Sequence, residues 1–208
     1  MKLRRRFLTL ALASLGLLAG LRADEPAATA APASPPAFSA GTKLIYKLSN
    51  GGTMLVAIDA FPARTGPVKF RYLFSDLGPL GTITMTKEAL ESATALHNNF
   101  DRGDFTLTDK TSVWLSQKIF AAAKAGQPVE LDLGEDGKVV FKIDPEGAGF
   151  FPLSFDHERT PDLGGAVETI LLKSEDGEKS IRVKNDADAP IIVDMDTGSF
   201  RVRLSLHL

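Results

Sequence analysis

Polar and apolar residues alternate along most of the chain beyond residue 42. The cleanest stretch lies near the end of the sequence, where Phe200, Val202, Leu204 and Leu206 alternate with Arg, Ser and His. In a β-strand, neighbouring side chains point to opposite faces, so this period predicts strands with one buried and one solvated face. Strands of that kind are typical of antiparallel sheets.

About eleven segments carry this alternation or a short apolar run, and we expect each to form a strand. They are residues 43–48, 53–60, 67–74, 81–86, 104–108, 128–133, 138–144, 151–155, 167–173, 179–184 and 190–207, the last a hairpin of two strands. Glycine-containing turns separate pairs of apolar runs, as they do in β-hairpins. These turns are Asn50-Gly51-Gly52, Asp136-Gly137, Asp176-Gly177 and Asp196-Thr197-Gly198.

Two segments show helical spacing instead. Residues 87–97 follow the candidate N-cap Thr86. Residues 117–125 lie between the candidate N-cap Ser116 and the helix stop Gly126. The elements together predict a mainly β fold, an antiparallel β-sandwich or a partly open barrel with one or two short helices.

The first 23 residues have the pattern of an export signal. Four basic residues, Lys2, Arg4, Arg5 and Arg6, precede an uncharged apolar run from Phe7 to Leu21. This run is shorter than the roughly 20 residues of a membrane-spanning helix, so we expect a cleaved signal peptide at 1–23 and no permanent membrane span. Arg4-Arg5-Arg6-Phe7-Leu8 resembles the twin-arginine signal, with an ordinary Sec signal as the alternative. The protein is therefore expected to be exported, to the periplasm or the cell exterior.

Residues 24–40 are rich in Ala and Pro, which predicts a linker ahead of a single β-rich domain at 41–208. Loss of the signal would remove five of the 24 basic residues and leave 19 against 26 acidic ones. A net charge of about −7 disfavours nucleic acid as a partner. The chain has no cysteine, so disulfides, thiol catalysis and cysteine-ligated metals are excluded, and no cofactor is expected.

One motif resembles the signature of aspartic proteases. It is Asp196-Thr197-Gly198-Ser199, in which Asp196 would share a proton with a second aspartate. The sequence contains no second Asp-Thr-Gly or Asp-Ser-Gly to supply that partner. Asp and Gly are also the residues that a tight turn between two strands requires, so we interpret the motif as a hairpin turn.

No spacing in the chain predicts a metal site. Four carboxylates lie close together in sequence, at Asp186, Asp188, Asp194 and Asp196. Such hard ligands suit Ca²⁺, but their spacing is not that of a calcium-binding loop. The three histidines are not spaced as zinc ligands. Four basic residues on solvated strand faces would form a basic stripe if their strands were neighbours: Lys69, Arg71, Arg201 and Arg203.

Two segments are candidate binding sites. The loop 156–162 brings an acid, a base and a cation together, which makes His157, Glu158 and Arg159 the candidates for a polar site. Phe150 and Phe151 follow a Gly-Ala-Gly sequence that we expect to be a loop between strands, and are candidates for an apolar contact. No nucleophile and no second histidine accompany the loop 156–162, and no catalytic residue is assigned.

The sequence leaves three functions open. The first is an exported cell-envelope protein with a non-enzymatic binding or scaffold domain, whose partner is an envelope protein, a polymer or a lipophilic molecule. The second is a periplasmic hydrolase or cofactor-using enzyme with a site assembled from distant residues. The third is a carrier of a lipophilic ligand. We favour a role without enzyme activity, because alternation and turns account for nearly every residue. A closed core would exclude the carrier.

Overall fold

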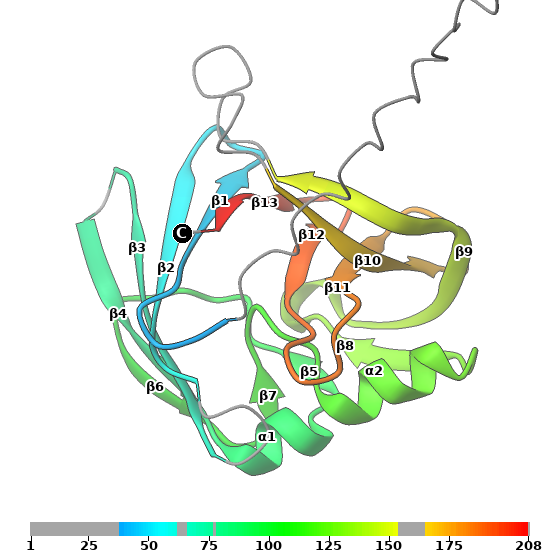
Figure 1. Cartoon of the computed structure of the whole chain (residues 1–208), viewed down its shortest axis with the longest axis horizontal. Helices are drawn as coiled ribbons and strands as arrows, with labels where there is room; N and C mark the ends of the chain where they lie inside the picture. The colour runs from blue at the N-terminus through cyan, green and yellow to red at the C-terminus, as the bar shows by residue number, and fades with distance from the viewer. Residues whose placement is uncertain (1–37, 62–65, 77, 154–164, 208) are drawn as a thin grey trace, which may run out of the picture. The chain divides into compact units, whose positions relative to one another are not determined.

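A computed structural model of the protein describes residues 38–61, 66–76, 78–153 and 165–207. Thirteen strands pair into one sheet with the order β6-β4-β3-β2-β1-β13-β12-β11-β10-β9-β8-β5-β7. The sheet curls round until it is nearly closed, and two short helices complete the domain (Figure 1). The predicted fold class, a mainly β barrel or sandwich with one or two short helices, is confirmed.

The strands of the first half of the sheet are β1 (Lys43–Leu48), β2 (Thr53–Ala60), β3 (Val68–Phe74), β4 (Gly78–Met85), β5 (Ala95–Leu96), β6 (Gly103–Leu107) and β7 (Lys110–Thr111). Those of the second half are β8 (Val129–Asp132), β9 (Lys138–Leu153), β10 (Gly165–Ser174), β11 (Ser180–Lys184), β12 (Ile192–Asp196) and β13 (Arg201–His207). All four predicted turns join strands that pair as antiparallel neighbours: β1 with β2, β8 with β9, β10 with β11, and β12 with β13.

The two helices begin where their N-caps predict. The Thr86 side chain accepts a hydrogen bond from the backbone of α1 (Lys87–Ser92), and Ser116 does the same for α2 (Gln117–Lys124). The prediction that the first helix reaches residue 97 is wrong. The chain turns extended at Ala93, and residues 95–96 form β5 because pairing with β7 and β8 outweighs the local helical spacing.

The predicted loop around residues 147–149 is also wrong, because these residues belong to the single long strand β9. β10 pairs with β9 on both sides of an irregularity between Thr169 and Leu171, which lets β9 bend without ending. A Cβ atom at Gly147 would lie 2.2 Å from Cδ2 of Leu171. The glycine is therefore required where the bent strand passes close to its neighbour.

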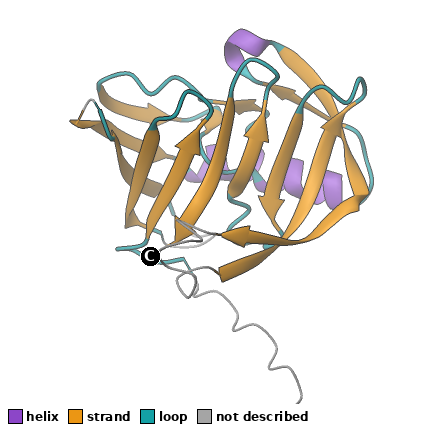
Figure 2. Cartoon of the chain, turned by 90° about the horizontal axis from the view of Figure 1, so that it is seen from above, coloured by secondary structure: helices purple, strands orange, loops and turns teal. Residues whose placement is uncertain are grey.

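The barrel closes through short parallel pairings that the sequence pattern did not predict. β6 pairs in parallel with β4 at one edge of the sheet, and β7 pairs in parallel with β5 at the other. These two edge strands are consecutive in the chain, so the turn between them brings the edges together. The helices lie together on one side of the barrel, where α1 contacts α2 and β7, and α2 contacts β8 and β9 (Figure 2).

Aromatic side chains fill one part of the barrel. Trp114, which we expected in the core, is 1% exposed, and its ring centroid lies 5.7 Å from that of Phe70 and 6.4 Å from that of Phe61. Phe38 is also buried and packs 6.5 Å from Phe61. The end of the segment predicted as linker thus contributes to the domain core. In the described part of the chain, no helix is long and apolar enough to cross a membrane.

The condition for a basic stripe is not met, because β3 and β13 are separated in the sheet by β2 and β1. Arg71 instead pairs with Asp59 on the adjacent strand, with an N–O distance of 2.8 Å. Arg201 pairs with Asp194 on its adjacent strand, with a distance of 2.6 Å. Cross-strand pairing of this kind is the common arrangement on a solvated sheet face.

Candidate functional site

The barrel contains a cavity of about 560 Å³ that opens to solvent. Its volume lies within the range of roughly 300–1,000 Å³ that is usual for small-molecule sites. Most of its wall is apolar, formed by Tyr46, Leu48, Met54, Phe74, Leu96, Phe100, Val113, Leu133, Ile192, Met195, Phe200 and Val202. The inward side chains of the barrel therefore do not pack into a closed core at this end.

The register of the sheet explains why these side chains meet. Val202 of β13 lies opposite Leu48 of β1 on one side and opposite Met195 of β12 on the other. Tyr46 of β1 lies opposite Met54 of β2. Residues that oppose each other in a ladder point to the same face, so these two rows of side chains face one cavity.

Tyr46 is held at the cavity wall by a hydrogen bond. Its hydroxyl group donates to the backbone carbonyl of Ile192 at 2.9 Å. Burial raises the pKa of the Tyr46 phenol well above its ordinary value. The phenol therefore keeps its proton, and that proton is already used in the hydrogen bond to Ile192. The wall around Tyr46 stays apolar in character.

The entrance of the cavity is polar. We call it the mouth and define it as Asn98, Asn99, Lys110, Glu135, Asp136, Thr197 and Ser199, all of which line the cavity. Most of these residues are exposed to solvent, whereas most of the wall residues are buried. An apolar chamber with a polar, solvated entrance is suited to a molecule with one apolar and one polar end.

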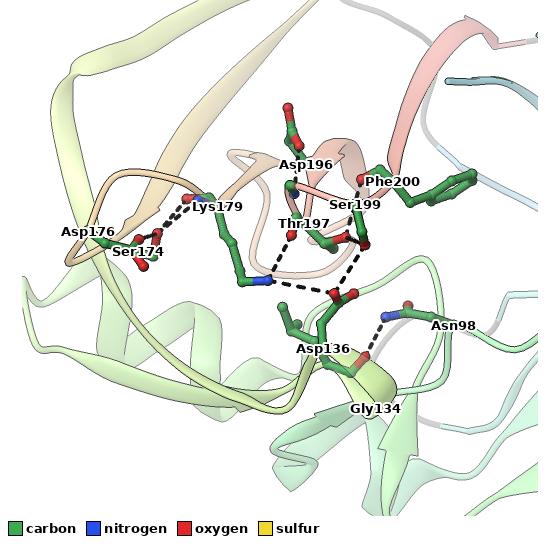
Figure 3. A network of polar contacts seen from close by, with 12 residues as sticks. Asn98, Gly134, Asp136, Ser174, Asp176, Lys179, Asp196, Thr197, Ser199 and Phe200 are labelled. Atoms are coloured by element: carbon green, nitrogen blue, oxygen red, sulfur yellow. Dashed lines mark hydrogen bonds and ion pairs between the residues drawn. The ribbon is translucent and has the colours of Figure 1, made fainter. Parts of the chain in front are cut away.

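A network of polar contacts connects three turns at the mouth (Figure 3). The Ser199 hydroxyl donates to Oδ1 of Asp136 at 3.2 Å, and Nζ of Lys179 lies 3.6 Å from the same oxygen. Lys179 also donates to the backbone carbonyl of Thr197 at 2.7 Å. The network fixes the turns that follow β8, β10 and β12 relative to each other.

The segment after β5 forms the other side of the entrance. The Tyr72 hydroxyl donates to the backbone carbonyl of Asp101. The ring of Phe100 lies 5.2 Å from that of Tyr72 and 6.2 Å from that of Phe74, both edge to face. Asn98 donates through Nδ2 to the carbonyl of Leu133 at 3.3 Å, which joins this segment to the turn after β8.

Among the described residues, His97 is the one histidine that lines the cavity. Its Nε2 atom is buried without a hydrogen-bond partner in the described part of the chain. Its ring lies 5.4 Å from that of Phe105 and 6.2 Å from that of Phe100. Desolvation lowers the pKa of His97, assisted by the charge of Lys110 and opposed by Asn99 and Asp101.

This environment predicts a pH dependence of stability. The unfolded chain binds a proton at His97 near the ordinary pKa of about 6.5, whereas the folded protein binds it only at lower pH. The free energy of unfolding should therefore fall as pH falls from 7 towards 5. His97→Leu should make this fall shallower, which denaturant titrations of both proteins at pH 5, 6, 7 and 8 will measure. Equal slopes for the two proteins would contradict the assignment to His97.

The sequence-based candidates lie elsewhere. His157, Glu158 and Arg159 are outside the described residues. Phe150 and Phe151 lie on β9 rather than on a loop, and neither lines the cavity. Phe150 is 68% exposed. Phe151 is buried, with the guanidinium carbon of Arg203 4.6 Å from its ring centroid. A role of either phenylalanine in contacting a partner stays a prediction.

The protease-like motif forms the turn between β12 and β13. Oδ1 of Asp196 accepts a hydrogen bond from the backbone of Gly198 at 2.9 Å, and Gly198 has a φ of +83°. The neighbouring aspartates are engaged separately, Asp194 with Arg201 and Asp186 with Lys184. Among the described residues, no three His, Asp or Glu side chains are grouped to hold a metal ion.

The polar side chains at the cavity differ in how they are engaged. Ser199 donates to Asp136, a carboxylate that Lys179 also contacts, and its hydroxyl oxygen lies 3.1 Å from that of Thr197. Nε2 of His97 makes no hydrogen bond to a hydroxyl group or carboxylate of the described residues. The chamber offers a large apolar surface and hydrogen-bonding groups at its entrance, which is the composition of a ligand site.

The sequence pattern did not identify the mouth. Asn98 and Asn99 have the composition of a helix end, and residues 134–137 and 196–199 have that of ordinary turns. Strands β8 and β12 run in the same direction, so the turns that follow them lie at the same end of the barrel. This could be inferred only with the strand order known.

Comparison with known proteins found no matching family model, no matching curated protein and no matching solved structure.

Proposed function

We propose that this protein is a non-enzymatic binding protein that holds a small lipophilic molecule in its barrel cavity. The single observation that carries the proposal is the apolar chamber of about 560 Å³ with an open, polar mouth. A closed and fully packed barrel would need no such chamber, because apolar side chains normally fill protein interiors to high density. An empty apolar space is a cost in stability unless a ligand fills it.

The N-terminal sequence indicates where the protein would bind its ligand. Residues 1–23 have the pattern of a signal peptide, and residues 24–37 continue with the Ala- and Pro-rich composition of a spacer. Export would place the domain in the periplasm or outside the cell, where lipophilic molecules must cross water between membranes. A carrier that shields the apolar part of its ligand would serve that purpose.

A series of 1-alkanols tests the proposal. The probe is N-phenyl-1-naphthylamine, an uncharged dye whose fluorescence rises in apolar surroundings, and the alcohols from hexanol to decanol are its competitors. We expect one dye site per chain. Each added methylene should strengthen competition about fourfold, because burial of one methylene is worth about 0.8 kcal/mol. Absence of saturable dye binding, or competition independent of chain length, would exclude a lipophilic site in this cavity.

A further inference from the structure

The charges at the mouth nearly balance. Lys110 and Glu135 are exposed residues of opposite sign, and neither forms an ion pair with another described residue. The carboxylate of Asp136 lies beside Lys179, which does not itself line the cavity. Counted with Lys179 and with Asp101, whose carboxylate binds Asn99, the mouth carries two positive and three negative charges. A net charge of −1 attracts a charged group only weakly, because water screens exposed charges.

The uncharged groups of the mouth present both hydrogen-bond donors and hydrogen-bond acceptors. The amide nitrogen of Asn98 donates to the Leu133 carbonyl, and that of Asn99 donates to Oδ2 of Asp101 at 2.7 Å. Each amide nitrogen carries two hydrogens and uses one of them in these contacts, so each side chain keeps one N–H group and its carbonyl oxygen for a ligand. Neither oxygen accepts a hydrogen bond from a described residue. The second oxygen of Asp136 is a further acceptor, since its described contacts are made through Oδ1.

These observations limit the polar end of the ligand. A carboxylate or phosphate only accepts hydrogen bonds, so it could take the free N–H groups but would leave the oxygens of Asn98, Asn99 and Asp136 without a donor. Lys110 adds a positive charge, but an exposed ammonium group contributes little because water screens it. A quaternary ammonium group can neither donate nor accept a hydrogen bond, so it would leave both the N–H groups and the oxygens unpaired. Hydroxyl groups both donate and accept, and they match every group in the mouth.

From this match we infer that the ligand is a single-chain amphiphile with an uncharged, hydroxylated head group, its chain in the cavity and its hydroxyl groups at the mouth. This inference rests on the proposed function and adds the chemical class of the polar end. It selects glycerol- or sugar-headed molecules over fatty acids and cationic amphiphiles of the same chain length.

Three amphiphiles with a twelve-carbon chain provide the test. Monolaurin, laurate and dodecyltrimethylammonium are titrated at pH 8, at micromolar concentrations, against the bound naphthylamine dye. Monolaurin should displace the dye at a concentration at least tenfold lower than either charged compound. Equal or tighter binding of laurate or dodecyltrimethylammonium would overturn the head-group inference and leave the lipophilic site intact. Failure of the dye itself to bind would instead remove the proposed function, and the inference with it.

A charge substitution at the mouth sharpens the result. Glu135→Lys leaves the mouth with an excess of positive charge, so laurate binding should strengthen at least fivefold while monolaurin binding stays within twofold. Glu146→Lys makes the same change on an exposed part of β9 outside the cavity lining, and it should leave both affinities unchanged. If Glu135→Lys weakens monolaurin and laurate equally, the head group does not lie at the mouth.

Discussion

Replacement of Val202 by Phe is expected to weaken binding of the naphthylamine dye at least tenfold. Val202 points inward from β13, between Leu48 and Met195, and all three side chains line the cavity. The larger ring would occupy the space that the ligand needs. Because the chamber can accept the ring, we expect the free energy of unfolding to change by less than about 1.5 kcal/mol, as for tolerated apolar substitutions.

Val140→Phe is the matched control for this substitution. Val140 lies on β9, is 37% exposed and does not line the cavity, so the same chemical change there should leave dye binding unaltered. Dye titration and thermal unfolding of the two variants separate loss of the site from loss of the fold. If Val202→Phe binds the dye as tightly as the unsubstituted protein, the ligand does not occupy this chamber.

Gly81→Ala should destabilise the fold more than Val202→Phe does. Gly81 of β4 lies opposite Gly103 of β6, and an added Cβ would lie 1.7 Å from the Gly103 carbonyl oxygen. It would also approach the hydroxyl of Tyr72, which holds Asp101. Because backbone cannot move aside as a side chain can, we expect a loss of about 3 kcal/mol in the free energy of unfolding.

The comparison for this variant is Gly165→Ala. A Cβ at Gly165 meets no atom within 4 Å, and the backbone there is not in the left-handed region. Its stability should stay within about 0.5 kcal/mol of the unsubstituted protein, as for most surface changes. Urea denaturation measures both variants. A Gly81→Ala protein as stable as Gly165→Ala would show that β4 and β6 do not approach as closely as described.

Local signals predicted most of the barrel. The bounds expected for the first two strands, 43–48 and 53–60, coincide with β1 and β2, because alternation and the Asn50-Gly51-Gly52 turn agree there. The same signals failed at residues 95–96, where two residues join a parallel ladder. A pair of residues carries no period, and parallel partners are far apart in sequence.

The cavity could not be predicted from the same pattern. Val202 and Met195 alternate with polar residues, and residues of a closed core do the same. The period alone therefore does not distinguish a cavity wall from a packed core. What separates the two cases is the curvature of the sheet and the volume that opposite walls leave between them. Likewise, Asp136 and Ser199 have the composition of simple turn residues, and only the strand order brings them together at one mouth.

Methionine methyl NMR tests the central claim most directly, because the three methionines of the described domain divide between two environments. Met54 and Met195 line the cavity, whereas Met85 is fully buried outside its lining, where its sulfur accepts a hydrogen bond from Ser112. With ¹³C-methyl methionine and added monolaurin, we predict large shifts for Met54 and Met195 and little change for Met85. Unchanged signals from Met54 and Met195 at saturating ligand would contradict a ligand-binding cavity in this barrel.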